Sequence, residues 1–213
     1  MRFLIIVVGL LLISCENKNL IESEVLFKIQ NKEVYSKNIL ELKIINKSNN
    51  DYFLCLDTTS MYFNPGVDYK INEFIHPKPI FYLNDEIIDV GYPLSSMIKP
   101  MSLDTAHYNC VKRNIEYSQE LLEDLRKLKK ILLIKSNTNV TLKLPFNNSQ
   151  IWCNELYTYI REEGSCKIQF KYKMNKAYFD RIVDKKLLLE LQQKKYKPYF
   201  KEIVSNKVPF ILK

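Results

Sequence analysis

The stretch CKIQFKYKM, residues 166–174, decides the fold class of this 213-residue chain, because its side chains alternate between apolar and polar. One face would carry Cys166, Ile168, Phe170, Tyr172 and Met174, and the other Lys167, Gln169, Lys171 and Lys173. A period of two residues is typical of a β-strand. In an antiparallel sheet, one face of such a strand packs on the core and the other is solvated. We therefore predict a central antiparallel strand here, with its lysines in water.

The same alternation recurs along most of the chain and predicts further strands. The segments are 25–30, 40–44, 52–56, 80–83, 87–90, 140–144, 199–204 and 208–212. Polar clusters separate several of them, which is typical of turns. The cluster at 46–51 predicts either a hairpin or a sandwich corner, and Asn84-Asp85 predicts a hairpin. Pro145 is expected to end its strand. The fold class predicted is mainly β.

Two segments change to helical periodicity. Ser118 is a good N-cap for a helix to about Lys130, with acidic residues early and basic residues late. Its apolar face would hold Leu121, Leu122, Leu125, Leu128 and Leu132. A second segment, 179–195, is a weaker helix candidate. One or two helices inserted in a single β domain over 24–213 are therefore expected, with a split near residue 135 as the alternative.

The N-terminus carries an apolar run over residues 3–13, which is too short for a membrane span and fits a secretory leader. It ends in Leu12-Ile13-Ser14-Cys15, which resembles the lipobox of bacterial lipoproteins. The resemblance implies cleavage of residues 1–14, diacylglycerol on Cys15 and a short tether over 15–23. An ordinary signal peptide with a chance cysteine is the alternative.

The resemblance also implies a location in the cell envelope, with the membrane as partner through the lipid. Glu16 follows Cys15 where Asp would favour inner-membrane retention, so the outer membrane facing the periplasm is expected. Lys18 lacks the acidic neighbours of a surface-export signal, which leaves surface display as the less favoured alternative.

Two stretches, ILELKIINKSNNDYFLCLD (39–57) and the later run LPF…GSCKIQFKYKM…YFKEIVSNKVPFIL (144–212), resemble uncharacterised Bacteroidota lipoproteins. This resemblance implies an immunoglobulin-like antiparallel β-sandwich and no catalytic residues. The triplets Asp57-Thr58-Thr59 and Asp104-Thr105-Ala106 resemble the O-glycosylation pattern of the same bacteria, with Thr58 and Thr105 as acceptors.

The chain is basic, with a formal net charge of +8, and almost all of its cations are lysines. Nucleic-acid binding favours arginine, so no nucleic-acid partner is expected. Attraction to an acidic surface, such as anionic lipid or polysaccharide, stays open. No closely spaced glycines form a phosphate-binding loop.

Once Cys15 carries the lipid, four cysteines remain available, Cys55, Cys110, Cys153 and Cys166, and an oxidising compartment permits disulfides. The turn between Cys153 and Cys166 favours a bridge between them, which leaves Cys55–Cys110 by elimination. Buried free thiols are the alternative. Paired C-x₂-C spacing is absent, so no metal site is predicted.

The sequence offers few candidates for catalysis and predicts no cofactor. His76 or His107 with Cys110 could be read as a Cys/His hydrolase. Residues three apart face each other only on a helix, and 107–110 shows no helical pattern. Carboxylate pairs at 85–86 and 162–163 are expected to be solvated. Trp152, Tyr157 and Tyr159 could stack on sugars or peptides, but core packing is favoured.

The favoured interpretation is a non-catalytic binding or scaffold module of the envelope, of which an inhibitor or immunity factor is one form. Its partner would be an envelope protein or a glycan. The alternative is an envelope hydrolase acting on glycan or peptide.

Overall fold

The computed structural model describes residues 23–61, 63–90, 93–97, 105–153, 155–160 and 165–212. The predicted leader, the lipid site Cys15 and nearly all of the tether lie outside these residues. None of the described helices is long and apolar enough to cross a membrane.

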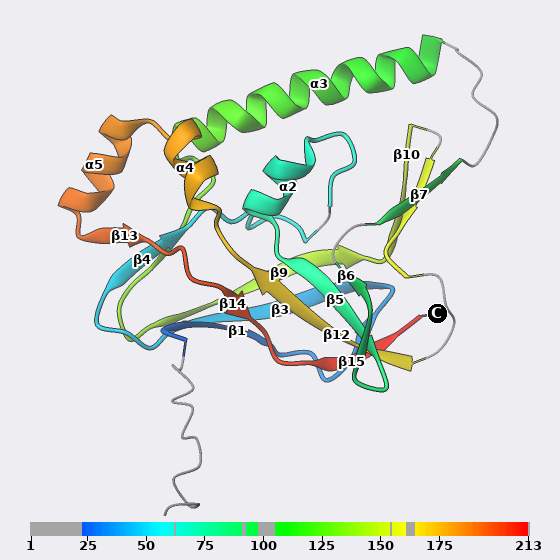
Figure 1. Cartoon of the computed structure of the whole chain (residues 1–213), viewed down its shortest axis with the longest axis horizontal. Coiled ribbons are helices and arrows are strands. Elements are labelled where there is room, and N and C mark those ends of the chain that lie inside the picture. Colours follow the sequence, from blue (N-terminus) through cyan, green and yellow to red (C-terminus); the bar gives the residue numbers. More distant parts are fainter. Residues whose placement is uncertain are drawn as a thin grey trace, which may run out of the picture.

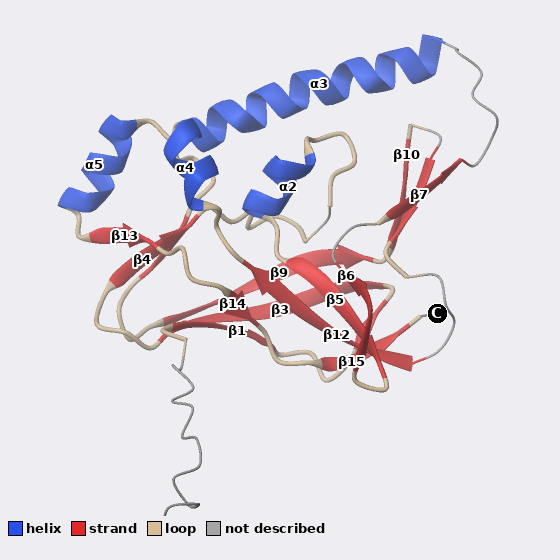
Figure 2. Ribbon diagram, viewed as in Figure 1, coloured by secondary structure: helices blue, strands red, loops and turns tan. Residues whose placement is uncertain are grey.

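Two sheets face each other and form the body of the molecule (Figures 1 and 2). The first has the order β1 (Val25–Ile29), β3 (Lys37–Asn46), β9 (Asn139–Asn147). The second has the order β2 (Val34–Tyr35), β15 (Val208–Ile211), β12 (Ser165–Tyr172), β5 (Lys78–Leu83), β6 (Glu86–Val90), and β14 (Ile203–Val204) also pairs with β12.

The strand order is that of an immunoglobulin-like sandwich. β1 pairs antiparallel with β3, whereas β2, a few residues later, pairs parallel with β15 in the other sheet. The first two strands of the chain therefore belong to different sheets. Strands β1, β3 and β9 correspond to strands A, B and E of that fold, and β5, β12 and β15 correspond to C, F and G. The predicted fold class is confirmed.

The core lies between the two sheets and is rich in aromatic rings. Phe146 of β9 is 5.7 Å from Phe170 of β12 and 6.1 Å from Phe210 of β15, measured between ring centroids. Phe27 of β1 packs 6.2 Å from Tyr172. The predicted inward face of β12 is confirmed, because Ile168, Phe170 and Tyr172 are buried.

The polar cluster at 46–51 is a sandwich corner rather than a hairpin. β4 (Asp51–Leu54) leaves β3 and pairs with β8 (Leu132–Ile134) and, in parallel, with β13 (Tyr196–Pro198). The buried Asn46 holds the corner, since its side-chain amide donates to the carbonyl oxygens of Asn50 and Lys135 at 2.8 and 3.1 Å.

Two predictions about strand ends need correction. Pro145 lies inside β9 and does not end it, because β9 is the last strand of its sheet and needs no N–H on its outer side. The strand predicted over 199–204 is shorter than expected, because β14 covers only residues 203–204. β14 and β15 both pair with β12, and Ser205 between them bonds to Phe170 through its backbone N–H and its Oγ.

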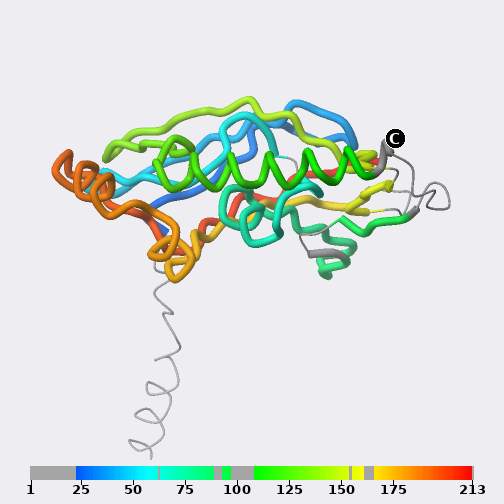
Figure 3. The backbone as a smooth tube through the Cα atoms, turned by 90° about the horizontal axis from the view of Figure 1, so that it is seen from above, coloured from blue at the N-terminus to red at the C-terminus, as the bar shows by residue number. Residues whose placement is uncertain are grey.

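The long helix α3 (Thr105–Arg126) begins well before the predicted cap at Ser118. Ser118 lies inside the helix and its hydroxyl donates to the carbonyl oxygen of Gly66 at 2.9 Å, so it is not a cap. The helix ends at Arg126 rather than Lys130, followed by Leu128 at a positive φ of 51°. Seen from above, α3 runs along the length of the molecule (Figure 3).

The second predicted helix is two helices, α4 (Lys176–Ile182) and α5 (Lys185–Gln193), because Asp184 caps a new N-terminus by accepting from the amides of Lys186 and Leu187. A short helix, α2 (Tyr69–Ile75), was not predicted. A separate sheet is formed by β10 (Ser149–Trp152), β11 (Glu155–Thr158) and β7 (Leu94–Met97).

Candidate functional site

A pocket of about 840 Å³ lies between α2, α4 and the adjoining ends of β5 and β12. These helices belong to the B–C and F–G connections, which lie at the same end of an immunoglobulin-like sandwich. Binding residues often occur on loops that a rigid scaffold positions. The volume is within the usual range for small-molecule sites.

Positive charge dominates the pocket wall. Six of its lining side chains are cationic and two are anionic: Lys70, Lys78, Lys171, Lys173, Lys176 and Arg181 against Glu73 and Glu202.

Each of the two carboxylates is already paired with a lysine from a strand end. Lys171 lies 2.8 Å from Glu202, and Lys78 pairs with Glu73. Lys78 and Lys171 are direct cross-strand neighbours, so the two pairs lie side by side. Within the described part of the chain, Lys70, Lys173 and Arg181 have no carboxylate within 4 Å, and all three are exposed. The pocket therefore offers an excess of positive charge to a ligand.

Two tyrosines add ring surface to the cationic wall. Tyr69 is 54% exposed and has the Lys70 ammonium 5.7 Å from its ring centre. Tyr178 packs edge-on against Phe74 at 5.2 Å, and the Arg181 guanidinium lies 5.1 Å from its ring centre. Burial raises the pKa of Tyr178, and the nearby Asp68 raises it further. Its hydroxyl is therefore a neutral donor at physiological pH.

The walls of the pocket are fixed by buried polar contacts. Asn72 of α2 is buried and donates to the carbonyl oxygens of Asn64 and Val67 at 2.8 and 2.9 Å. The Tyr172 hydroxyl lies 2.8 Å from the Cys55 carbonyl oxygen and 3.0 Å from that of Phe74. This one side chain links the end of β12 to the end of α2.

Replacing Tyr172 by phenylalanine should lower the free energy of unfolding by about 1–3 kcal/mol, because two buried carbonyl groups lose their shared donor. Urea unfolding followed by circular dichroism measures the change. A matched Tyr82→Phe variant removes a hydroxyl whose one hydrogen bond among the described residues is to the part-buried Gln169 side chain, and should cost less. Equal losses in the two variants would contradict the role given to Tyr172.

No family model, no curated protein and no solved structure matches this chain.

The predicted disulfide pairing is wrong. The structure joins Cys110 to Cys153, and Cys55 and Cys166 are free thiols. Cys166 is fixed opposite Phe210 in the β12–β15 pairing, whereas Cys153 directly follows β10 of the small sheet and is joined to α3. Cys55 is fully buried at the end of β4.

The Cys/His pair considered from the sequence lacks a free thiol at Cys110. The 107–110 stretch does lie on a helix, against the prediction, but the Cys110 sulfur is in the disulfide. The Cys55 thiol is no substitute as a nucleophile, because burial raises its pKa to about 12. The His107 side chain lies outside the described residues. His76 is buried, and its Nδ1 has no partner among the described residues.

The buried His76 should make stability depend on pH. The pKa of His76 is lowered from 6.5 to about 4, mainly by burial and to a smaller extent by Lys130, although Asp57 and the Ser60 backbone oppose the shift. Between these values the unfolded chain binds a proton that the folded chain does not. The free energy of unfolding should therefore fall as pH drops from about 6.5 to 4, by roughly 3 kcal/mol at most.

Unfolding of the wild type and of His76→Gln, measured at several pH values, isolates this contribution. The difference between the two free energies should shrink toward pH 4 and stay constant above pH 7. A difference that is the same at pH 4 and pH 7 would contradict the buried neutral imidazole.

The remaining sequence candidates do not gather with the pocket. Asp85 is in the exposed β5–β6 turn and pairs with Lys167, which lowers its pKa. Glu162 and Glu163 lie outside the described residues. Tyr159 is buried in the core, and Trp152 and Tyr157 are half-buried in the small sheet. Thr58 is exposed beside Asp57, whereas the Thr105 side chain is outside the described residues.

No group of three His, Cys, Asp or Glu side chains that could hold a metal occurs in the part of the chain the structure describes. The pocket residues themselves were not predicted as a site. Lys171 and Lys173 were assigned to a solvated face, and Tyr69, Lys70 and Arg181 were not singled out. Their signal is distributed over two segments about 100 residues apart, and neither segment is unusual alone.

Proposed function

We propose that this protein is a lipid-anchored, non-catalytic binding protein of the bacterial cell envelope, and that its pocket between α2 and α4 captures an anionic ligand. The observation that carries the proposal is the excess of cations there. Six basic side chains face two carboxylates, and both carboxylates are already paired.

The ion pairs of Lys78 and Lys171 with glutamates support a division of roles among the cations of the pocket. These two lysines are neutralised by Glu73 and Glu202, so they contribute mainly to the wall. Lys173 and Arg181 are exposed and have no carboxylate partner among the described residues. A ligand carboxylate, sulfate or phosphate would supply the anionic partner that these two side chains lack. Charge-assisted hydrogen bonds of this kind are stronger than neutral ones.

The two tyrosines favour a ligand with an apolar ring face beside its charge. A sugar ring presents C–H groups on one face and hydroxyls at its edges, and can stack on an exposed ring such as Tyr69. An acidic oligosaccharide combines both properties. This agrees with the glycan partner expected from the sequence.

The lipid anchor is supported by the Leu12-Ile13-Ser14-Cys15 motif alone. Metabolic labelling with an alkyne palmitate tests it. The wild-type protein should take up the label and the Cys15→Ala variant should not. Label that persists in the variant would rule out Cys15 as the attachment point.

Ligand binding is tested by calorimetric titration with three polymers of increasing charge: dextran, polygalacturonate and dextran sulfate. Polygalacturonate should bind, and its affinity should fall with added salt because the contacts are exposed. Uncharged dextran should not bind. Equal binding of dextran and polygalacturonate would exclude an anion site.

A further inference from the structure

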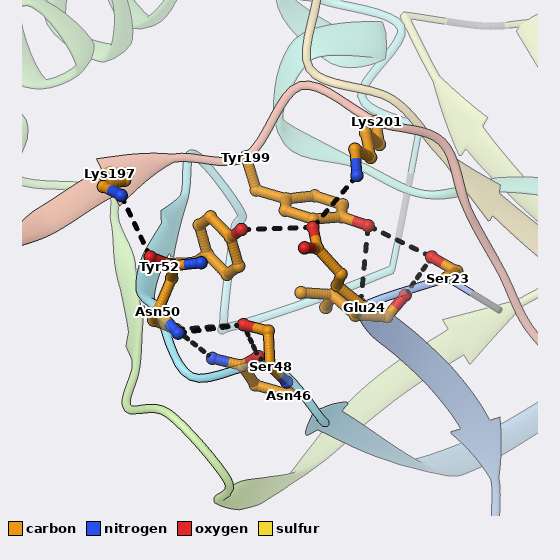
Figure 4. A network of polar contacts seen from close by, with 10 residues as sticks. Ser23, Glu24, Asn46, Ser48, Asn50, Tyr52, Lys197, Tyr199 and Lys201 are labelled. Atoms are coloured by element: carbon orange, nitrogen blue, oxygen red, sulfur yellow. Dashed lines mark hydrogen bonds and ion pairs between the residues drawn. The ribbon is translucent and has the colours of Figure 1, made fainter. Parts of the chain in front are cut away.

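The domain begins at a fixed point, directly after the expected tether (Figure 4). The Tyr199 hydroxyl is 3.1 Å from the Ser23 hydroxyl and accepts from the Val25 amide at 3.4 Å. Glu24 accepts from the Tyr52 hydroxyl and from the Lys201 ammonium, both at 3.1 Å. A tether that ends at residue 23 would therefore hold this part of the domain, and not a loose arm, close to its anchor.

Two segments that contact residues 23–25, at 47–52 and 195–201, carry four exposed lysines: Lys47, Lys195, Lys197 and Lys201. We call these four residues the tether rim. The Lys47 amide donates to the Glu24 carbonyl oxygen at 2.8 Å, and the Lys197 ammonium donates to the Asn50 side chain at 2.9 Å. Lys195 lies with Lys197, Asn49 and Asn50 in the wall of a second pocket of about 600 Å³.

Among the described residues, two carboxylates beside the tether rim, Glu24 and Asp51, are engaged. Glu24 is bonded to Lys201 and Tyr52, and this hydrogen bond from Lys201 is the largest cause of its lowered pKa. The Asp51 carboxylate accepts from the Ser136 amide at 2.7 Å. The tether rim therefore presents a net positive charge at the place where the chain would come from the membrane.

The length of the tether sets how far this charge can be from a bilayer. Seven residues lie between Cys15 and Ser23, and the eight steps that join the two Cα atoms span about 28 Å at full extension and less in a coiled chain. Attraction between lysines and anionic headgroups acts within a Debye length, about 8–10 Å at physiological salt. A tether of this length that is not fully extended would place the rim within that range.

From the fixed tether point and the surrounding charge, we propose that the tether rim lies against the anionic phospholipid headgroups of the membrane that holds the anchor. The inference rests on the lipid anchor of the proposed function. It assigns an orientation to the anchored domain, with α3 on the side away from the start of β1 and hence away from the bilayer (Figure 1).

The test is lysine acetylation of the lipidated full-length protein in vesicles, read by mass spectrometry. One vesicle preparation contains phosphatidylethanolamine and phosphatidylglycerol, and the other only phosphatidylcholine. Acetylation of Lys195, Lys197 and Lys201 should be at least threefold slower in the anionic vesicles. Lys112 on the exposed side of α3 is the internal control and should react equally in both.

A Lys197→Gln/Lys201→Gln variant should lose the slowing at Lys195, and 0.5 M salt should remove it in the wild type. Equal acetylation of the rim in both vesicle types would overturn the orientation while leaving the anchor in place. Absence of acyl groups on Cys15 in the same sample would overturn the anchor and the orientation together.

Discussion

Replacing Cys110 and Cys153 together by serine is expected to lower the free energy of unfolding by about 4 kcal/mol. The bridge closes a 43-residue separation, and its loss restores the conformational entropy of that loop to the unfolded chain. It also joins α3 to the β10–β11 hairpin. Urea unfolding of the oxidised wild type and of the double variant measures the difference.

A Cys166→Ser variant is the matched control, because Cys166 is a half-buried free thiol outside the bridge. Its cost should stay below about 1 kcal/mol, as for most substitutions away from special features. The same pair of variants distinguishes the observed bridge from the one predicted from sequence. If Cys153 were bonded to Cys166, the Cys166→Ser variant would show the large loss.

Reversing two charges in the pocket, Lys173→Glu with Arg181→Glu, is expected to weaken binding of polygalacturonate at least 30-fold, or about 2 kcal/mol. Both side chains lack a carboxylate partner among the described residues, so their charge is available to a ligand. The variant replaces attraction by repulsion at the centre of the cationic wall. Calorimetric titration at low salt gives the affinity.

The control for this variant is Lys112→Glu with Arg113→Glu on α3. It removes one lysine and one arginine from exposed positions outside the pocket and changes the net charge by the same amount. Its affinity should change less than threefold. Equal weakening by both variants would mean that polygalacturonate responds to overall charge, and the pocket would have no special role.

The strand pattern was predictable because each strand of a sandwich packs one face on the core, so apolar side chains recur at every second residue. The alternation in β12 gave the correct inward face, and Asn84-Asp85 gave the correct hairpin, where both residues have positive φ values of 48° and 66°. Pairing partners were harder to predict, because β14 and β15 are neighbours along the chain and yet both pair with β12, on either side of Ser205.

The first half of α3 was missed because packing on the core does not shape its sequence. Tyr108, Val111 and Ile115 are exposed, so the apolar residues there do not mark the buried face. The later half contains Leu121 and Leu125, which are buried and gave the helical signal. The bridge at Cys110 attaches the first half instead, and a disulfide partner cannot be found from spacing alone.

The pocket could not be predicted because it depends on which connections lie at one end of the sandwich. Lys70 and Arg181 come from different insertions, and single exposed lysines are ordinary on a basic protein. Only the pairing of β5 with β12 places Lys78 beside Lys171 and brings the two helices together.

The most direct test of the anion pocket is a crystal structure of the protein with a galacturonate oligosaccharide, at a concentration well above the dissociation constant from titration. We predict a sugar carboxylate between Lys173 and Arg181, with a ring on Tyr69. A sugar bound elsewhere, or an empty pocket under conditions where titration shows saturation, would contradict the proposed binding site.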